Sequence, residues 1–223
     1  MIKYYYEDKT KKELTTKLLE SFEENGKYFA RLEDSIFYPQ GGGQKGDRGY
    51  LIIGDEKYNI INTIKDENYT SILIVDRLID IKYIGQAVTC FLDWNFRYRQ
   101  MRLHTALHLY HYTIESIKGS AVDYPLASNI EDGFAYNKYD ENSFDMSILD
   151  KVNEMFYDLI KTDNQVKTYP DLEKEHYRWW ECMNYKVPCG GVHVDKLSEI
   201  GNINIETYHK KKVITIKFTF NEA

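Results

Sequence analysis

The stretch Phe96–Lys118 contains neither glycine nor proline, and this feature constrains the fold more than any other. Asp93 or Asn95 can cap its start, and Gly119 suits the position just after a helix. The apolar positions recur at helical spacing, which predicts one long helix with a stripe to bury. They are Leu103, Leu107, Tyr110, Ile114 and Ile117.

Two histidines, His104 and His108, lie four residues apart on this helix. Side chains at that spacing lie one above the other on the same face, so both imidazoles can reach one ion. Ordinary packing is the alternative for such a pair. Thr105 occupies the place where HExxH metalloproteases carry their general base, which argues against peptide hydrolysis by that route.

A second pair of metal-binding side chains lies at Cys189-Gly190-Gly191-Val192-His193. The segment follows Pro188, and its two glycines allow a tight turn that brings the thiol and the imidazole to one point. Thiolate and imidazole are favoured ligands of zinc, and four such groups complete a tetrahedron. The sequence therefore predicts a zinc site. Its expected ligands are His104, His108, Cys189 and His193; a structural thiol and core histidines that never meet are the alternative.

The first 92 residues have the pattern of a small β-barrel. Asn25-Gly26 divides Leu14–Glu33 into a hairpin, although Leu18-Leu19 alone would also suit a helix. Short strands punctuated by Gly, Asp or Asn follow at regular spacing. They are Tyr50–Ile53, Tyr58–Ile61, Ile72–Val75 and Ala87–Leu92.

The pattern from residue 93 onward mixes helices and strands. We expect a helix over Met146–Lys161, a strand over Val166–Tyr169, a possible helix over Leu172–Trp180, and a closing hairpin from Asn202–Tyr208 and Val213–Phe220. The expected fold class is α+β, with a small N-terminal β-barrel domain (1–92) followed by an α+β domain (93–223).

Composition restricts the environment and the partners. The three cysteines are too few for a disulfide framework, and the N-terminus has no apolar signal core, so we expect a cytoplasmic protein that does not enter a membrane. The net charge of −6 argues against a wholly basic nucleic-acid binder but permits a local basic groove. Solvated surface is the alternative for each basic cluster. The clusters are Arg97, Arg99 and Arg102, and the turn His209-Lys210-Lys211-Lys212.

Two motif matches are rejected. Gly41–Gly46 fits GxGxxG, but a strand follows where a dinucleotide site needs a helix, and no Gly-Lys-Ser/Thr completes a P-loop. Asn68-Tyr69-Thr70 fits the glycosylation pattern, which has meaning only in a secreted protein.

Three stretches together carry a resemblance to a known family. Phe37-Tyr38-Pro39-Gln40-Gly41-Gly42-Gly43-Gln44-Lys45-Gly46-Asp47 precedes the histidine pair and the Cys189–His193 segment. In this order and at these separations, they resemble the medium form of the free-standing alanyl-tRNA editing proteins, relatives of the editing domain of alanyl-tRNA synthetase. The resemblance covers nearly the whole chain, and the combination of motifs is highly specific.

The resemblance implies a zinc-dependent aminoacyl-tRNA deacylase. Its partner would be mischarged alanine tRNA carrying serine, with glycine as a second candidate, and the glycine-rich loop would lie near the editing pocket. Gln44 is the candidate for orienting water or the ester, and zinc would either activate water or orient the substrate. The expected pocket residues are Gly42, Gly43, Thr105 and Val192, and the expected tRNA-binding residues are Arg99 and Arg102.

One departure from the family concerns selectivity. The family commonly has threonine where this chain has Val192, so we expect a weaker preference for serine if that side chain faces the pocket, and little effect if it faces the core. His111 lies on the same side of the helix as His104 and is a candidate for supporting the site or for simple packing. Two other functions stay open: a non-catalytic zinc-containing RNA-binding protein, and a zinc hydrolase of another activated ester.

Overall fold

The computed structural model describes residues 1–68 and 70–221, so Tyr69 of the glycosylation pattern lies outside the described residues. The chain divides into two units, which we call the barrel unit (Met1–Gly41 with Lys45–Tyr98) and the α+β unit (Gly42–Gln44 with Arg99–Ala223). This division assigns Gly42–Gln44 to the second unit and falls between Tyr98 and Arg99 in the long helix.

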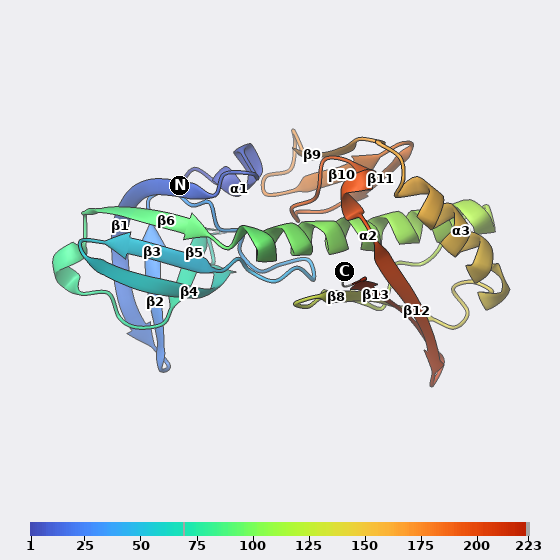
Figure 1. Ribbon diagram of the computed structural model, residues 1–223, viewed down its shortest axis with the longest axis horizontal. Helices are drawn as coiled ribbons and strands as arrows, with labels where there is room; N and C mark the ends of the chain where they lie inside the picture. The colour runs from blue at the N-terminus through green and yellow to red at the C-terminus, as the bar shows by residue number, and fades with distance from the viewer. Residues whose placement is uncertain (69, 222–223) are drawn as a thin grey trace. The chain divides into compact units, whose positions relative to one another are not determined.

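The barrel unit is a closed barrel of six strands in the order β1-β2-β5-β4-β3-β6 (Figure 1). The predicted Asn25-Gly26 turn is present, and both residues have the positive φ that such turns require (50° and 72°). The predicted barrel is therefore confirmed, and Leu18 belongs to a strand. The strands are β1 (Glu13–Glu24), β2 (Lys27–Leu32), β3 (Gly49–Ile53), β4 (Glu56–Lys65), β5 (Ser71–Val75) and β6 (Ala87–Leu92); short helices α1 (Tyr4–Glu7) and η1 (Ile81–Tyr83) accompany them.

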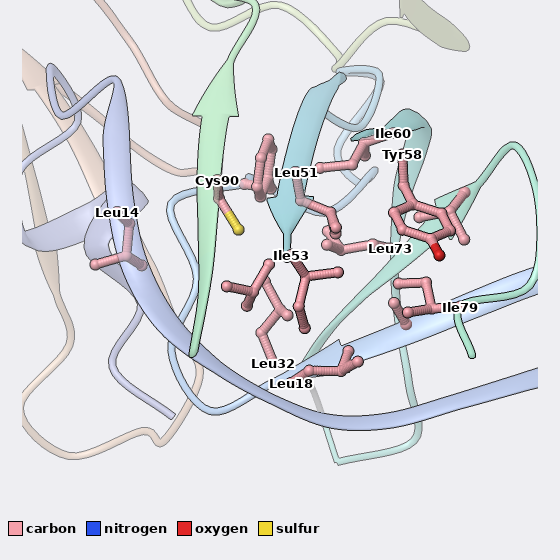
Figure 2. Packing of buried hydrophobic residues seen from close by; sticks show 14 of the residues in the cluster. Leu14, Leu18, Leu32, Leu51, Ile53, Tyr58, Ile60, Leu73, Ile79 and Cys90 are labelled. Atoms are coloured by element: carbon pink, nitrogen blue, oxygen red, sulfur yellow. The ribbon is translucent and has the colours of Figure 1, made fainter. Parts of the chain in front are cut away.

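The core of the barrel unit comes from alternate residues of these strands. Leu18, Leu51, Ile53 and Cys90 are almost completely buried, and Figure 2 shows their side chains among those of neighbouring strands. Alternation places every second side chain inside, as expected for strands with one buried face. Burial raises the pKa of Cys90 to about 12, so this thiol packs as a small apolar group.

A buried ion pair joins Asp47 to Arg97, and both side chains are fully buried. Arg97 also donates to the carbonyl of Ile36, while Asp47 accepts from the backbone N–H of Tyr38. A buried charge pair persists only when further hydrogen bonds satisfy it, and these bonds do so. Arg97 is therefore structural, and the prediction that it belongs to a phosphate-binding surface is wrong.

The α+β unit is built around the long helix α2 (Trp94–Lys118), which extends the predicted helix at its start. Two antiparallel sheets have the strand orders β11-β10-β9 and β12-β13-β8-β7. The predicted closing hairpin and the strand at Val166 are present. The remaining elements are β7 (Ala127–Ile130), β8 (Phe134–Asp140), η2 (Met146–Ile148), α3 (Leu149–Leu159), β9 (Val166–Pro170), β10 (Arg178–Cys182), β11 (Tyr185–Pro188), η3 (Leu197–Ile200), β12 (Ile203–Lys210) and β13 (Val213–Phe220).

The two sheets contact α2 through different residues. Trp180 of β10 stacks on His108, with ring centroids 5.1 Å apart. Asn137 of β8 donates to the carbonyl of Leu107 at 3.2 Å. The histidine-bearing part of α2 is therefore covered by protein. No helix among the described residues is long and apolar enough to cross a membrane.

The predicted helix over Leu172–Trp180 is wrong. Asp171 accepts hydrogen bonds from the backbone N–H groups of Glu173 and Lys174, which forms a turn, and Trp179 and Trp180 then pair with β9 and β11. Acidic side chains that bond the backbone two or three residues ahead favour turns over helix interiors. The helix predicted over Met146–Lys161 starts with the turn η2 and ends at Leu159.

Asp66 in the barrel unit gives a pH-dependent contribution to stability. Burial opposes ionisation of its carboxyl, but hydrogen bonds from Thr70 and the neighbouring Arg31 outweigh it and lower the pKa to about 2. Because this folded-state pKa is depressed, the stabilisation is present above the unfolded pKa near 4 and is lost as the pH falls towards 2. Solvent near the partly exposed Arg31 screens the interaction, so the stabilisation from ionised Asp66 amounts to about 1–2 kcal/mol.

We expect Asp66→Asn to lower the free energy of unfolding at neutral pH and to converge on the wild type as the pH approaches about 2. Urea titrations across this range measure the difference. Asp55→Asn, at an exposed position in the β3–β4 turn, is the control for removing a carboxylate from the same unit. A gap between Asp66→Asn and the wild type that stays constant with pH would contradict the assignment.

Candidate metal centre

Four nitrogen and sulfur ligand atoms of His104, His108, Cys189 and His193 all lie within 4.8 Å of one another. Cys189 Sγ is 3.5 Å from His104 Nε2, 3.3 Å from His108 Nε2 and 3.3 Å from His193 Nε2. One helix supplies the first pair and the segment after β11 supplies the second. The structure therefore brings together the four predicted residues, and they can hold a metal ion.

Burial sets the protonation state of the cluster. It lowers the pKa of His108 to about 3 and that of His104 well below its ordinary value, because the charged imidazolium loses solvation. Burial likewise raises the pKa of Cys189 to about 11. These two imidazoles are thus neutral and ready to bind a cation, while the thiol releases a proton on binding.

Gln44 determines which nitrogen of His104 faces the cluster. The backbone N–H of Val192 can only donate, and it lies 3.2 Å from Gln44 Oε1, so this atom is the acceptor. The same oxygen lies 2.9 Å from His104 Nδ1, which must therefore carry the proton. The lone pair of His104 is then on Nε2, the atom that faces Cys189.

Thr105 has the same effect on His193. Its hydroxyl donates to the carbonyl of Met101 at 2.9 Å, as is common for threonine in helices, and lies 3.2 Å from His193 Nδ1. Because the Thr105 hydroxyl donates its hydrogen to Met101, its oxygen can only accept a hydrogen bond from His193 Nδ1–H. The lone pair of His193 is then on Nε2. Two of the three histidines are therefore held in the tautomer that a metal ion requires.

Glycine is required where the two ligand segments meet. A Cβ on Gly191 would lie 2.2 Å from His104 Cε1, too close for any other residue. A Cβ on Gly43, whose φ is 80°, would lie 2.7 Å from the carbonyl oxygen of Ser128. Gly43 in turn accepts from the N–H of Ile130 at 2.9 Å. These contacts fix the glycine-rich segment and the Cys189 segment within the α+β unit.

A cavity of about 280 Å³ borders the cluster. His104, His108 and Cys189 form part of its wall, so three of the four donors are accessible from one side. Structural zinc sites are closed, whereas catalytic sites keep an open side. The remaining lining residues are Gly42, Leu107, His111, Tyr124, Pro125, Ser128, Asn137, Tyr185, Val187, Pro188 and Gly190.

Most of the other predicted pocket residues are not part of the cavity wall. Of Gly42, Gly43, Thr105 and Val192, only Gly42 is part of the cavity wall. Thr105 and Val192 are buried and support the ligands as described above. Gln44 is also buried; its Nε2 has no hydrogen-bond partner among the described residues.

His111 contacts the cavity rather than the cluster. It lines the wall and its Nδ1 lies 3.1 Å from the hydroxyl of Tyr139. Trp180, Tyr124, Ser128 and Asn137 were not predicted from the sequence, because they come from strands and a connecting segment whose approach to α2 depends on tertiary structure. The only local signal was the pair Trp179-Trp180, which is typical of a strand. The prediction of a helix over Leu172–Trp180 obscured this signal.

The predicted tRNA-binding arginines differ in environment. Arg99 is half-exposed and pairs with Asp132 at 2.9 Å. Arg102 donates to the carbonyl of Ile200 at 2.9 Å and lies over the ring of Phe220, 4.3 Å from its centroid. Arg102 thus joins α2 to the C-terminal hairpin, which accounts for its position without a phosphate.

The fold and the site define an α+β protein with a barrel unit and a four-residue centre that can hold a metal ion. No protein-family model matches the chain. The chain is 32% identical over 209 residues to the alanyl-tRNA editing protein AlaX-M of Pyrococcus horikoshii, covering 90% of this chain and 88% of that protein. The chain therefore belongs to the alanyl-tRNA editing proteins, and the resemblance inferred from its motifs is confirmed.

Two further relatives are longer than this chain. AlaX-L of the same organism is 29% identical, and the match covers 93% of this chain but 54% of that protein. The alanine–tRNA ligase of Ignicoccus hospitalis is 24% identical, and the match covers 96% of this chain but 25% of the ligase. The chain therefore spans about half the length of AlaX-L and a quarter of the length of the ligase.

The hydrogen bonds of Gln44 predict a measurable effect on metal affinity. Gln44→Ala leaves His104 Nδ1 and the Val192 N–H buried without their acceptor, so we expect affinity for a divalent probe such as Co²⁺ to fall about 10- to 100-fold. Competition with a chelator measures this loss. Gln40→Ala is the control, because Gln40 is exposed and bonds only Asn62 among the described side chains. Equal affinities in the two variants would refute the role of Gln44.

Proposed function

We propose that this protein hydrolyses wrongly charged alanine tRNA, releasing serine or glycine from the 3′ end. The observation that carries the proposal is the cavity bordered by three of the four converging donors. The family supports the substrate: its relatives are named as alanyl-tRNA editing proteins, and the match to AlaX-M covers nearly all of both chains.

We propose zinc as the metal, with His104, His108, Cys189 and His193 as its ligands. Three imidazoles and one thiol are a donor set that zinc prefers, and the lone pairs fixed by Gln44 and Thr105 suit it. When bound, zinc would supply a Lewis acid for polarising water or the ester carbonyl. His193 is fully buried, so a substrate group would approach from the side of the other three ligands.

The chain's own residues would position the ester and limit water. Gly42 lines the cavity with no side chain to obstruct it, so the backbone can approach the substrate closely. Gln44 holds His104, and its unpaired Nε2 supports a further catalytic role in orienting the ester or a water. A group placed within reach of these donors reacts at a higher effective concentration than in solution.

Contacts with the tRNA body are proposed at the exposed cations. Arg99 is half-exposed beside Asp132, and the hairpin between β12 and β13 presents Lys210, Lys211 and Lys212, all exposed. Phosphate contacts need only a few such cations, so the net charge of −6 is compatible with them. Arg102 is the weaker candidate because of its contacts with Ile200 and Phe220.

Deacylation assays with tRNA test the proposed function. The purified protein should hold about one zinc ion per chain and should release serine from Ser-tRNA(Ala) faster than buffer alone. Cys189→Ala should lose most of both properties. Cys182→Ala, a buried thiol of β10 outside the cluster, should keep both. A zinc-loaded wild type that leaves seryl and glycyl esters intact would instead favour a non-catalytic RNA-binding protein.

Val192 gives a prediction on selectivity. Its backbone N–H bonds Gln44, while its side chain is buried and is not part of the cavity wall. We therefore expect Val192→Thr to lower stability by about 1 kcal/mol, because a hydroxyl is buried, without changing the ratio of kcat/KM for Ser-tRNA and Ala-tRNA. A clear rise in that ratio would show that the side chain at 192 contacts the substrate.

A further inference from the structure

Tyr124 is an exposed aromatic ring on the wall of the cavity beside the metal centre. It lies between α2 and β7 and is 65% exposed, although it also lines the cavity. No hydrogen bond from its hydroxyl occurs among the described residues. No hydrogen bond of the hydroxyl therefore explains why this ring is placed at the cavity.

One face of this ring is supported by buried residues. Tyr124 stacks on His111, with ring centroids 5.7 Å apart and planes 14° from parallel. His111 is buried and is in turn nearly parallel to the ring of Tyr139, at 5.8 Å and 3°. The inner face of Tyr124 thus rests on a buried column, and its exposed area lies elsewhere on the ring.

The segment carrying Tyr124 is held on both sides. The backbone N–H of Val122 donates to Glu115 at 2.9 Å, and that of Leu126 donates to the carbonyl of Lys138 at 2.7 Å. A ring fixed in this way loses little conformational freedom when a second flat group packs on it, which favours binding.

The substrate of the proposed function brings a flat group to this place. The amino acid is esterified to the ribose of the terminal nucleotide, so the adenine base is one sugar away from the ester. With the ester beside His104 and Cys189, the base must lie along the same cavity or at its rim. Bases of single-stranded RNA bind proteins mainly by stacking on aromatic rings.

The two tyrosines lining the cavity differ in their surroundings. Tyr185 is half-buried and contacts the rings of Tyr112 and Trp180, and burial raises the pKa of its hydroxyl. Tyr124 is the one with an exposed ring. Resting on the proposed function, we infer that Tyr124 is the platform on which the terminal adenine of the tRNA stacks, and that it determines substrate affinity rather than the chemical step.

Steady-state kinetics with Ser-tRNA(Ala) tests this role. Tyr124→Ala should raise KM roughly 5- to 100-fold with little change in kcat, because stacking is lost and the metal ligands are untouched. Tyr124→Phe keeps the ring and should behave as the wild type. Tyr208→Ala, an exposed tyrosine of β12 outside the cavity, is the matched control. Zinc content and circular dichroism identify any variant that fails to fold.

A pair of small substrates makes the test specific for the base. The wild type should hydrolyse 3′-O-seryl adenosine with a higher kcat/KM than the seryl ester of a methyl riboside, which has no base. Tyr124→Ala should remove most of this difference, whereas Tyr124→Phe should keep it. If Tyr124→Ala retains the full preference for adenosine, the platform assignment is wrong while the deacylase function stands. A wild type inactive on Ser-tRNA(Ala) would overturn the proposed function itself.

Discussion

The α+β unit depends on hydrogen bonds to a few buried polar atoms, each of which has few other partners within reach. Four donor atoms lie within 4.8 Å of one another in a largely buried part of the unit, and unpaired polar groups in such a place are costly. A single acceptor, Gln44 Oε1, serves both His104 and the backbone of Val192, and the Thr105 hydroxyl serves His193. These bonds join three segments far apart in the sequence and leave the remaining nitrogens directed at Cys189.

The barrel unit contains a different buried charge, the carboxylate of Asp47. The hydrogen bonds of this carboxylate explain why the glycine-rich motif ends in aspartate. Asp47 and Tyr38 exchange hydrogen bonds across the base of the loop, through the Asp47 N–H and the Asp47 carboxylate. Arg97 neutralises that carboxylate and also bonds Ile36. These bonds fix Tyr38 and Asp47, at the two ends of the loop, within the barrel unit, so the aspartate that closes the motif has a structural role.

The sequence predicted those features whose cause is local. Helical spacing placed His104 and His108 on one face, and the glycines before His193 allowed the turn that the structure contains. The helix over Leu172–Trp180 was wrong because the hydrogen bonds of the Asp171 side chain and the pairing of Trp179 and Trp180 outweigh the helix propensity of that segment. Apart from Gly42 and the three ligands, the cavity wall was not predictable, because its residues come from several elements that meet only in the folded unit.

The metal centre borders the cavity on one side, through His104, His108 and Cys189, and is buried at His193. This asymmetry explains why most of the predicted pocket residues are absent from the cavity wall. His193 is fully buried and its ring is held by Thr105, while Gln44 and Val192 close the space next to His104. Thr105 and Val192 support the ligand segments and are not part of the cavity wall. Recognition of the substrate therefore falls to the cavity wall, whose residues differ from those that hold the ligands.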